Sequence, residues 1–449
     1  MDFLLILSNY FEYIFWFVIV FTIIVFVHEF GHYYVARLNN VQIEKFSIGF
    51  GPVLLSKVDK HKTKWQICAF PLGGYVKFFG EMYPDKSNES DIHNKKLFMN
   101  KKALQKASIV LAGPLANFLL SLVLFILIFS FFGKNFTSPI IGDIKKNSPA
   151  EQSGLLKGDR IISINSINIE GFDDYYEISD GELLEKIDIT ILRNDKKYNI
   201  DIVPQHKLIK TFIGTDKYIN YIGIRPIIEP VVGKVIKNSP AYFAGLLYKD
   251  KIIKINNNDI YDANEVIKII KVNANKKIDL SIIRDNKVIN LSLIPKEVSE
   301  KKIGQIGITF NKNRQKLNFY NSFILAANSI YEVTVKTLIA FYEIIFGKRD
   351  HCEVGGPILI AKVSNDVANT DMVSFVALIA LISVNLGLIN LFPLPLLDGG
   401  HFFTYISEFI IGKNINYNFF KFIQILGVII IISFMSFSIL NDIYCRILN

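Results

Sequence analysis

Two histidines and a glutamate lie close together in the segment HEFGH at 28–32, at the end of an apolar stretch. Residues four apart lie on one face of a helix, so His28 and His32 can present both imidazoles to a single metal ion. This spacing is typical of two ligands of a tetrahedral zinc site. Glu29 lies about 100° further round the helix, where its carboxylate can reach a metal-bound water without being a ligand. The segment therefore predicts His28 and His32 as zinc ligands and Glu29 as a general base.

The apolar surroundings of this segment favour a metal site. Each ionisable side chain placed inside a membrane span costs roughly 2–3 kcal/mol on insertion scales, and a bound metal offsets that cost. The alternative is a polar cluster that ends a helix at the membrane interface and binds no metal.

A third ligand has to come from a distant part of the chain, because the residues just after HEFGH contain no further histidine. Asp398, in the segment NLFPLPLLDGGH at 390–401, is the first charged residue after a long uncharged run. Two prolines break the apolar helix before it, and irregular backbone at membrane depth is tolerated where it lines a cavity. We expect Asp398 to be the third ligand. His401 is an alternative on spacing alone, and an aspartate that only ends a helix is the alternative without metal.

Four apolar stretches are long enough to cross a bilayer, which takes about 20 residues. They lie at 11–36, 107–132, 372–397 and 422–440. A further apolar stretch at 322–346 is interrupted by charges, so we expect an amphipathic helix there, on the membrane surface or against the helix bundle.

The segment between the second and third spans contains an internal repeat. SPA at 148–150 recurs at 239–241, and GLL at 154–156 recurs at 245–247, always with an offset of 91 residues. A constant offset over such a length indicates two copies of one domain. Each copy is expected to fold as short strands and helices and resembles a PDZ domain, which adds a peptide as an extra strand on an open sheet edge. Gly223, in the loop YIGI at 221–224, is expected to bind a peptide carboxylate for the second copy. A pair of plain spacer domains is the alternative.

The expected fold class is a multi-pass α-helical membrane protein with four spans, a membrane-associated β-hairpin region and two tandem PDZ-like α+β domains. The hairpin is predicted from 65–70, the turn PLGG and 75–78. The expected parts are a first span at 1–37, a loop with β-segments at 38–106, a second span at 107–133, PDZ-like domains at 137–206 and 218–298, a linker with amphipathic helices at 299–371, a third span at 372–398 and a fourth at 420–442.

Composition agrees with a membrane protein that has a large part in water, since 51% of the residues are hydrophobic and 20% are charged. The net charge of +9 is better explained by loops beside a membrane than by nucleic-acid binding, so we expect no nucleic-acid partner. The three cysteines are widely separated and odd in number, and they predict neither a disulfide framework nor a cysteine-rich metal site.

The distribution of basic residues predicts the orientation. The loop at 37–106 carries 13 Lys and Arg against 6 Asp and Glu, and the tail before the first span carries no Lys or Arg. This loop is therefore expected on the cytoplasmic side, with both termini and 134–371 outside. HEFGH then lies near the cytoplasmic end of its span.

HEFGH, the segment AGPLAN at 112–117, the two tandem copies and NLFPLPLLDGGH together resemble the site-2 protease family of intramembrane zinc metalloproteases. The resemblance covers nearly the whole chain. It implies one zinc ion per chain, held by His28, His32 and Asp398, with Glu29 as the catalytic base. It also implies that Asn390 holds the substrate or the developing oxyanion.

The resemblance implies further that the glycine-rich segments at 49–51 and 71–75, the latter with Gly73 and Gly74, are β-segments that approach the active site and contact the substrate. The expected setting is a bacterial inner membrane, with the PDZ-like copies in the periplasm. Expected partners are the lipid bilayer, single-span membrane proteins as substrates and peptide C-termini at the PDZ-like copies. By resemblance, the substrate would be a trimmed anti-sigma factor of an envelope stress pathway, or a signal-peptide remnant.

Two other functions stay open at this point. A non-catalytic membrane scaffold would present the PDZ-like copies without needing HEFGH or Asp398. A zinc transporter would want several ionisable groups within its spans, and the other three spans are nearly free of them.

Overall fold

The protein is described from a computed structural model. The structure describes residues 2–79, 96–210, 216–298, 303–311, 313–347, 352, 355–369, 371–413 and 417–445. Two compact units emerge: a membrane unit, made of Met1–Phe132 and Leu317–Asn449, and an inserted unit, Gly133–Lys316.

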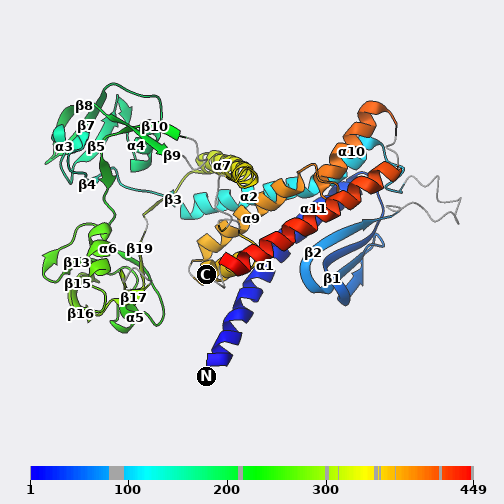
Figure 1. The fold of residues 1–449 in the computed structure, drawn as a ribbon, viewed down its shortest axis with the longest axis horizontal. Coiled ribbons are helices and arrows are strands. Elements are labelled where there is room, and N and C mark those ends of the chain that lie inside the picture. Colours follow the sequence, from blue (N-terminus) through cyan, green and yellow to red (C-terminus); the bar gives the residue numbers. More distant parts are fainter. Residues whose placement is uncertain are drawn as a thin grey trace. The chain divides into compact units, whose positions relative to one another are not determined.

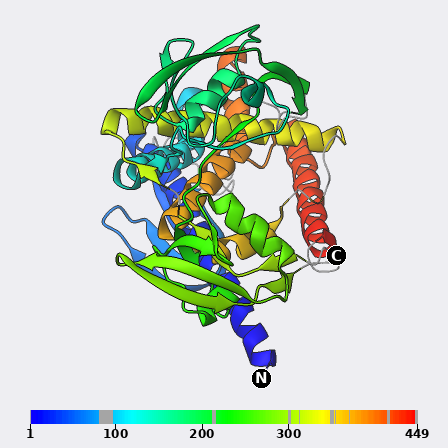
Figure 2. The same cartoon turned by 90° about the vertical axis from the view of Figure 1, so that its left-hand side faces the viewer.

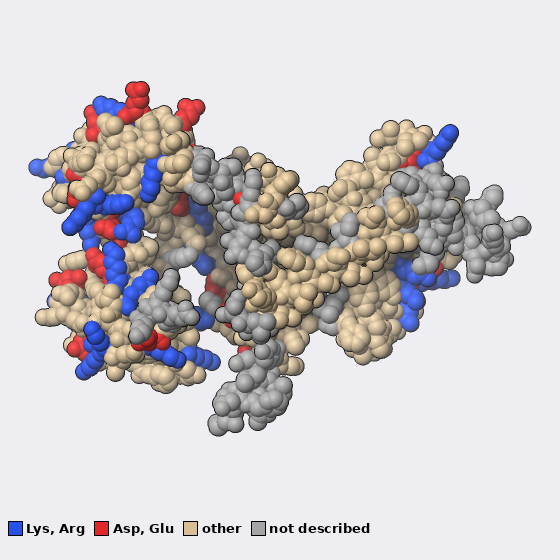
Figure 3. All heavy atoms as spheres, in the orientation of Figure 1, with Lys and Arg blue, Asp and Glu red and all other residues tan. Residues whose placement is uncertain are grey.

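The membrane unit is a bundle of long helices with one sheet (Figure 1). Its helices are α1 (Asp2–Leu38), α2 (Ala103–Leu127, continued by a π-helical turn at Ile128–Phe132), α7 (Phe319–Ile345), α8 (Pro357–Ala368), α9 (Met372–Asn390), α10 (Asp398–Ile411) and α11 (Tyr417–Ile443). The face of this bundle that Figure 3 shows carries few charged side chains. Among the described residues, four of its helices are long and apolar enough to cross a membrane, at Phe11–Leu38, Ala103–Phe132, Phe319–Ile344 and Met372–Asn390. Three of these four are spans that the sequence predicts.

The fourth candidate, within α7, covers the stretch predicted as amphipathic. α7 contacts α2 and α9 but runs across them rather than alongside (Figures 1 and 2). Of the two positions predicted for this helix, the structure shows the one against the helix bundle. The predicted span at 422–440 lies within α11, which has no charged residue over that stretch.

Small residues let the first two helices approach closely, as is common in membrane bundles. A β-carbon added at Gly31 of α1 would lie 2.4 Å from the backbone oxygen of Ala112 in α2. A β-carbon at Gly387 of α9 would lie 3.0 Å from the backbone oxygen of Pro114 in α2. α2 is thus the central helix, in contact with both α1 and α9.

The sheet of the membrane unit pairs differently from the predicted hairpin. It is formed by β1 (Ile43–Val58) and β2 (Lys64–Phe78). The first part of β1 lies between the two halves of β2, since Phe46 pairs with both Trp65 and Val76. The prediction that 65–70 pairs with 75–78 was therefore wrong. The buried residues Ile43 and Phe46 belong to the first part of β1, which explains why this part takes the central position.

The inserted unit contains two copies of one fold, as the repeat predicts. We call them the first module (141–226) and the second module (232–310). Their four-stranded sheets have matching orders, β6-β5-β7-β8 and β14-β13-β15-β16. The strands are Arg160–Ile164 (β5), Ile167–Asn168 (β6), Ile187–Arg193 (β7), Lys196–Ile202 (β8), Lys251–Ile255 (β13), Asn258–Asp259 (β14), Ile278–Arg284 (β15) and Lys287–Leu293 (β16). The helices are Pro149–Gln152 (α3), Phe172–Ser179 (α4), Pro240–Phe243 (α5) and Ala263–Val272 (α6).

Equivalent ion pairs and turns repeat in both modules. Arg193 pairs with the buried Asp159, and Arg284 pairs with the buried Asp250, each at 2.7 Å. The turns at 194–195 and 285–286 have positive φ at both central residues, as type I′ hairpins require.

The structure corrects the assignment of Gly223. The strand after it, β11 (Ile224–Pro226), pairs with β4 (Ile141–Ile144) of the first module. Gly307 has the equivalent place in the second module, before β19 (Ile308–Phe310), which pairs with β12 (Val232–Val235). A β-carbon at either glycine would lie 2.3 Å from the β-carbon of a serine of its own module, Ser148 or Ser239. The closing strands come 84 rather than 91 residues apart, so the constant offset could not reveal them.

The cysteines predict no disulfide framework, but the structure contains one disulfide that the sequence did not predict. Cys352 and Cys445 form a disulfide, with Cα atoms 5.6 Å apart, and Cys68 is a free buried thiol. Beside the disulfide, the Asp442 carboxylate of α11 accepts hydrogen bonds from the backbone N–H groups of Gly356 and Ile358 at the start of α8. Two cysteines 93 residues apart give no sign of their proximity in a sequence.

Candidate metal centre

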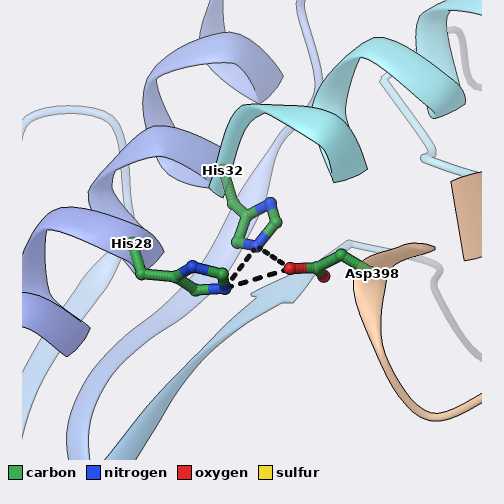
Figure 4. Close-up of side chains that lie close together, drawn as sticks. All are labelled: His28, His32 and Asp398. Atoms are coloured by element: carbon green, nitrogen blue, oxygen red, sulfur yellow. Dashed lines mark hydrogen bonds and ion pairs between the residues drawn. The ribbon is translucent and has the colours of Figure 1, made fainter. Parts of the chain in front are cut away.

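Three predicted ligands, distant in sequence, meet at one point between α1 and the start of α10 (Figure 4). Oδ2 of Asp398 lies 3.0 Å from Nε2 of His28 and 3.4 Å from Nε2 of His32. The two Nε2 atoms are 3.2 Å apart. Ligand atoms at zinc bond lengths of 2.0–2.2 Å form a tetrahedron with an edge of roughly 3.3 Å. The three donors therefore have both the chemistry and the spacing that a zinc ion requires.

The chain between α9 and α10 explains how Asp398 reaches the histidines. α9 ends at Asn390, and the backbone folds back before α10 begins at Asp398. A β-carbon at Gly399 would lie 2.3 Å from the backbone oxygens of Leu391 and Phe392, so only glycine permits this tight return. Gly400 has the same role, since a β-carbon there would lie 2.2 Å from the backbone oxygen of Leu394.

His401 does not join the cluster. Among the described residues, the group able to hold a metal contains His28, His32 and Asp398. The His401 ring instead stacks with that of Tyr405, with centroids 6.4 Å apart. The geometry thus favours Asp398 over the alternative ligand that the spacing left open.

Glu29 lies beside the three donors but is not one of the candidate ligands. It interacts electrostatically with His28, His32 and Asp398, and it lies near the backbone of Val76 in β2. A β-carbon at Gly74 would lie 3.0 Å from Cγ of Glu29, so Gly74 lets β2 pass close to this carboxylate. The arrangement suits a base that acts on a metal-bound water.

Gly113 is part of the centre, although sequence reasoning gave it no individual role. A β-carbon there would lie 2.2 Å from Nε2 of His32 and 2.9 Å from Cε1 of His28. Gly113 therefore leaves the space that both imidazoles occupy. The signal in the sequence was AGPLAN, whose glycine and asparagine both face the histidines.

Two hydrogen bonds orient the imidazoles. Nδ1 of His32 lies 2.9 Å from the backbone oxygen of Ile109 in α2. Nδ1 of His28 lies 3.3 Å from Nδ2 of Asn117, which is fully buried in the same helix. Partners of this kind fix ring orientation at metal sites.

The predicted substrate-binding residues lie in different parts of the structure. Gly74 adjoins Glu29, and a β-carbon at Gly73 would instead meet the ring of Phe50. Asn390 is the last residue of α9, eight residues before Asp398. Gly223 lies in the first module, in the other unit.

Comparisons with known proteins agree with this centre. The model of peptidase family M50 matches residues 16–434. The regulator of sigma-E protease of Escherichia coli is 31% identical over 442 residues, covering 95% of this chain and 97% of that protein. A Rickettsia conorii protein named "putative zinc metalloprotease" is 32% identical over 427 residues, with the same coverage of both chains.

Among solved structures, the PDZ domain of an SdrC-like protein from Listeria monocytogenes aligns with 18% of this chain and 84% of its own length. Its TM-score is 0.17 and its identity 22%.

A match of the family model to nearly the whole chain, and relatives above 30% identity along its length, agree with the resemblance seen in the motifs. The chain belongs to peptidase family M50, the site-2 protease family, and is a zinc metalloprotease.

Proposed function

We propose that the chain is an intramembrane endopeptidase that cuts the transmembrane segment of single-span membrane proteins. The observation that carries this proposal is the position of the metal triad. His28 and His32 are 8% and 7% exposed and lie on a helix apolar enough to cross a membrane. Ionisable side chains inside a span are rare and mark functional sites. A peptide bond that is cut at such a site has to reach it from within the bilayer.

The proposed chemistry divides between the metal and the side chains. His28, His32 and Asp398 would hold one zinc ion per chain, which would supply a Lewis acid and lower the pKa of a bound water to about 7. Glu29 accepts the proton of that water and donates it to the leaving amine. Asn390 is proposed to hold the substrate or the developing oxyanion.

The edge of β2 next to Glu29 is proposed to hold the substrate in an extended form. A helical substrate hides its carbonyls in hydrogen bonds, so it has to unwind locally before it can be cut. The segment Gly74–Phe78 pairs with β1, and Gly74 at its start lies close to Glu29. An added strand along this edge would give the unwound backbone its hydrogen-bond partners. Gly73 and Gly74 would lie at the start of that edge.

The proposed location is a bacterial inner membrane, with the inserted unit in the periplasm and the metal near the cytoplasmic side. The cysteines support this orientation, because disulfides form in oxidising compartments such as the periplasm. Cys352 and Cys445 fall in segments that the basic residues place outside. Cys68, a free thiol, falls in the loop placed inside.

The two modules are proposed to act as PDZ-like domains that bind peptide C-termini next to β11 and β19, with Gly223 and Gly307 in the carboxylate-binding loops. In this role they would admit trimmed substrates and exclude proteins with bulky outer domains. By family resemblance, a trimmed anti-sigma factor is the first candidate substrate, and the Escherichia coli relative is named a regulator of sigma-E protease. Signal-peptide remnants are a second candidate class.

The test uses the purified full chain in lipid nanodiscs with a single-span reporter, and the products are identified by mass spectrometry. We expect cleavage within the apolar span, loss of cleavage with a zinc chelator and recovery with added zinc. Cutting only in the aqueous flanks would contradict the proposal. Zinc flux without cleavage would favour a transporter, and stable reporter binding without cleavage would favour a scaffold.

A further inference from the structure

Asn117 is fully buried beside the metal centre. One polar atom of its side-chain amide has a hydrogen-bond partner, and the other has none among the described residues. Its Nδ2 lies 3.3 Å from Nδ1 of His28. Its Oδ1 is buried and has no hydrogen-bond partner among the described residues. A buried amide oxygen without a partner costs free energy, so its presence next to a ligand needs an explanation.

The chemistry of a metal-bound histidine supplies that explanation. When Nε2 of His28 binds zinc, the neutral ring carries its proton on Nδ1, which then acts as a donor. An amide Nδ2 is also a donor and cannot accept that proton. His32 shows the favourable case, since its Nδ1 faces the Ile109 carbonyl at 2.9 Å.

We infer that Asn117 orients His28 for zinc binding by accepting the Nδ1–H through its Oδ1. A rotation of the amide by 180° exchanges Oδ1 and Nδ2 and gives the unpartnered oxygen this hydrogen bond. The arrangement in the structure suits the other tautomer, in which Nε2 of His28 donates to Oδ2 of Asp398 at 3.0 Å and Nδ1 accepts from Asn117.

The backbone of Asn117 is held firmly enough to perform this positioning role. Its carbonyl accepts hydrogen bonds from Oγ of Ser121 and from Oγ of Ser383, each at 2.9 Å. Ser121 also donates to the Ala380 backbone oxygen in α9. These bonds join α2 to α9, the helix that leads to the Asp398 turn.

The experiment measures zinc affinity of the full chain in detergent by competition with a fluorescent chelator, and thus needs no cleavage assay. Asn117→Ala removes the acceptor and is expected to weaken zinc binding 10–100-fold, the usual effect of losing such a partner. Asn117→Asp keeps an acceptor and is expected to stay within about threefold of the wild type, as carboxylate–histidine–zinc groups do. Leu119→Ala, at an exposed position of the same helix, leaves the bonds of Asn117 in place and is expected to leave the affinity unchanged.

The Asp variant separates positioning from packing. If Asn117 only fills space, burying a charge in its place lowers zinc affinity at least as much as Ala does, and that result overturns the inference. Wild-type affinity in the Ala variant overturns it as well. The inference rests on the proposed zinc site, so His28→Ala serves as reference: a wild-type chain that binds no more zinc than His28→Ala refutes the site itself.

Discussion

A missing side chain is as important to the metal centre as the ligands themselves. Gly113 of α2 faces both imidazoles, and a β-carbon there would lie 2.2 Å from the ligand atom of His32. The contact is with the end of a side chain, so the helix can keep its course while the imidazole moves. Metal binding is therefore more sensitive to this position than folding is.

We predict that Gly113→Ala loses zinc while the chain stays folded. The added methyl group displaces His32 from its position near His28 and Asp398, and zinc affinity is expected to fall at least about 10-fold. Zinc content and thermal unfolding of the purified chain measure the two effects. Leu115→Ala, at an exposed position of the same helix, is the control and should keep its zinc. A fully zinc-loaded Gly113→Ala chain would show that the spacing is not tight.

The ligands could be predicted from the sequence, and their surroundings could not. HEFGH predicts two ligands and a base by helical periodicity, and Asp398 is recognisable as a candidate ligand because it is a lone charge after a broken apolar stretch. The roles of Gly113 and Asn117 depend on how α1 crosses α2, more than 80 residues later in the chain. That crossing is a property of packing between helices, which periodicity within one helix does not reveal.

At the scale of elements, α10 has to hold Asp398 in place. A buried ion pair fixes α10 to α2. Nζ of Lys106 in α2 lies 3.4 Å from Oε2 of Glu408 in α10, and their side chains are 9% and 12% exposed. The same Nζ lies 5.0 Å from the centre of the Tyr405 ring. A long cationic side chain thus contacts two residues of the helix that begins with the third ligand.

We predict that Lys106→Met and Glu408→Leu each destabilise the chain by about 3–5 kcal/mol, because each leaves one charge of a buried pair behind. The double variant is expected to lose less than either single change. The Coulomb attraction and the desolvation cost disappear together in that variant. Unfolding in detergent with increasing denaturant measures the coupling. Strictly additive losses would mean that the two side chains act separately.

The pairing of strands shows the limit of local sequence signals at this scale. The stretch 65–78 has the alternation and the turn residues of a hairpin, yet its two halves flank the first part of β1. Both arrangements satisfy the local pattern. The buried Phe46 decides between them, because it has neighbours on both sides only in the central position.

At the scale of the whole molecule, the inserted unit begins and ends at one place. β3 (Lys134–Asn135) pairs with β20 (Arg314–Gln315), so the two ends of the insertion lie side by side. The repeat predicts two domains but places the end of the second at 298, whereas its closing strand is β19. A deletion designed from the sequence alone, such as 140–297, would remove the first module and cut through the second, leaving its closing strand β19 without its partner β12.

We predict that replacing 136–313 with Asn-Gly, which joins β3 to β20 through a tight turn, leaves a folded membrane unit. If the modules exclude untrimmed substrates, this variant should cut a reporter with a bulky outer domain about as fast as a trimmed one. Parallel cleavage of both reporters by the full chain and the variant measures the discrimination. Unchanged preference for the trimmed reporter would place the selection elsewhere.

The account depends most directly on Glu29 as the base at a zinc site held by other residues. Glu29→Gln keeps the shape of the side chain and removes its ability to accept a proton, and Glu29 is not a ligand in the described geometry. Zinc content and cleavage of a single-span reporter are measured on the same purified sample. The account predicts one zinc per chain and a loss of cleavage of at least about 100-fold. Full cleavage by a zinc-loaded Glu29→Gln chain, or loss of zinc from it, would contradict the account.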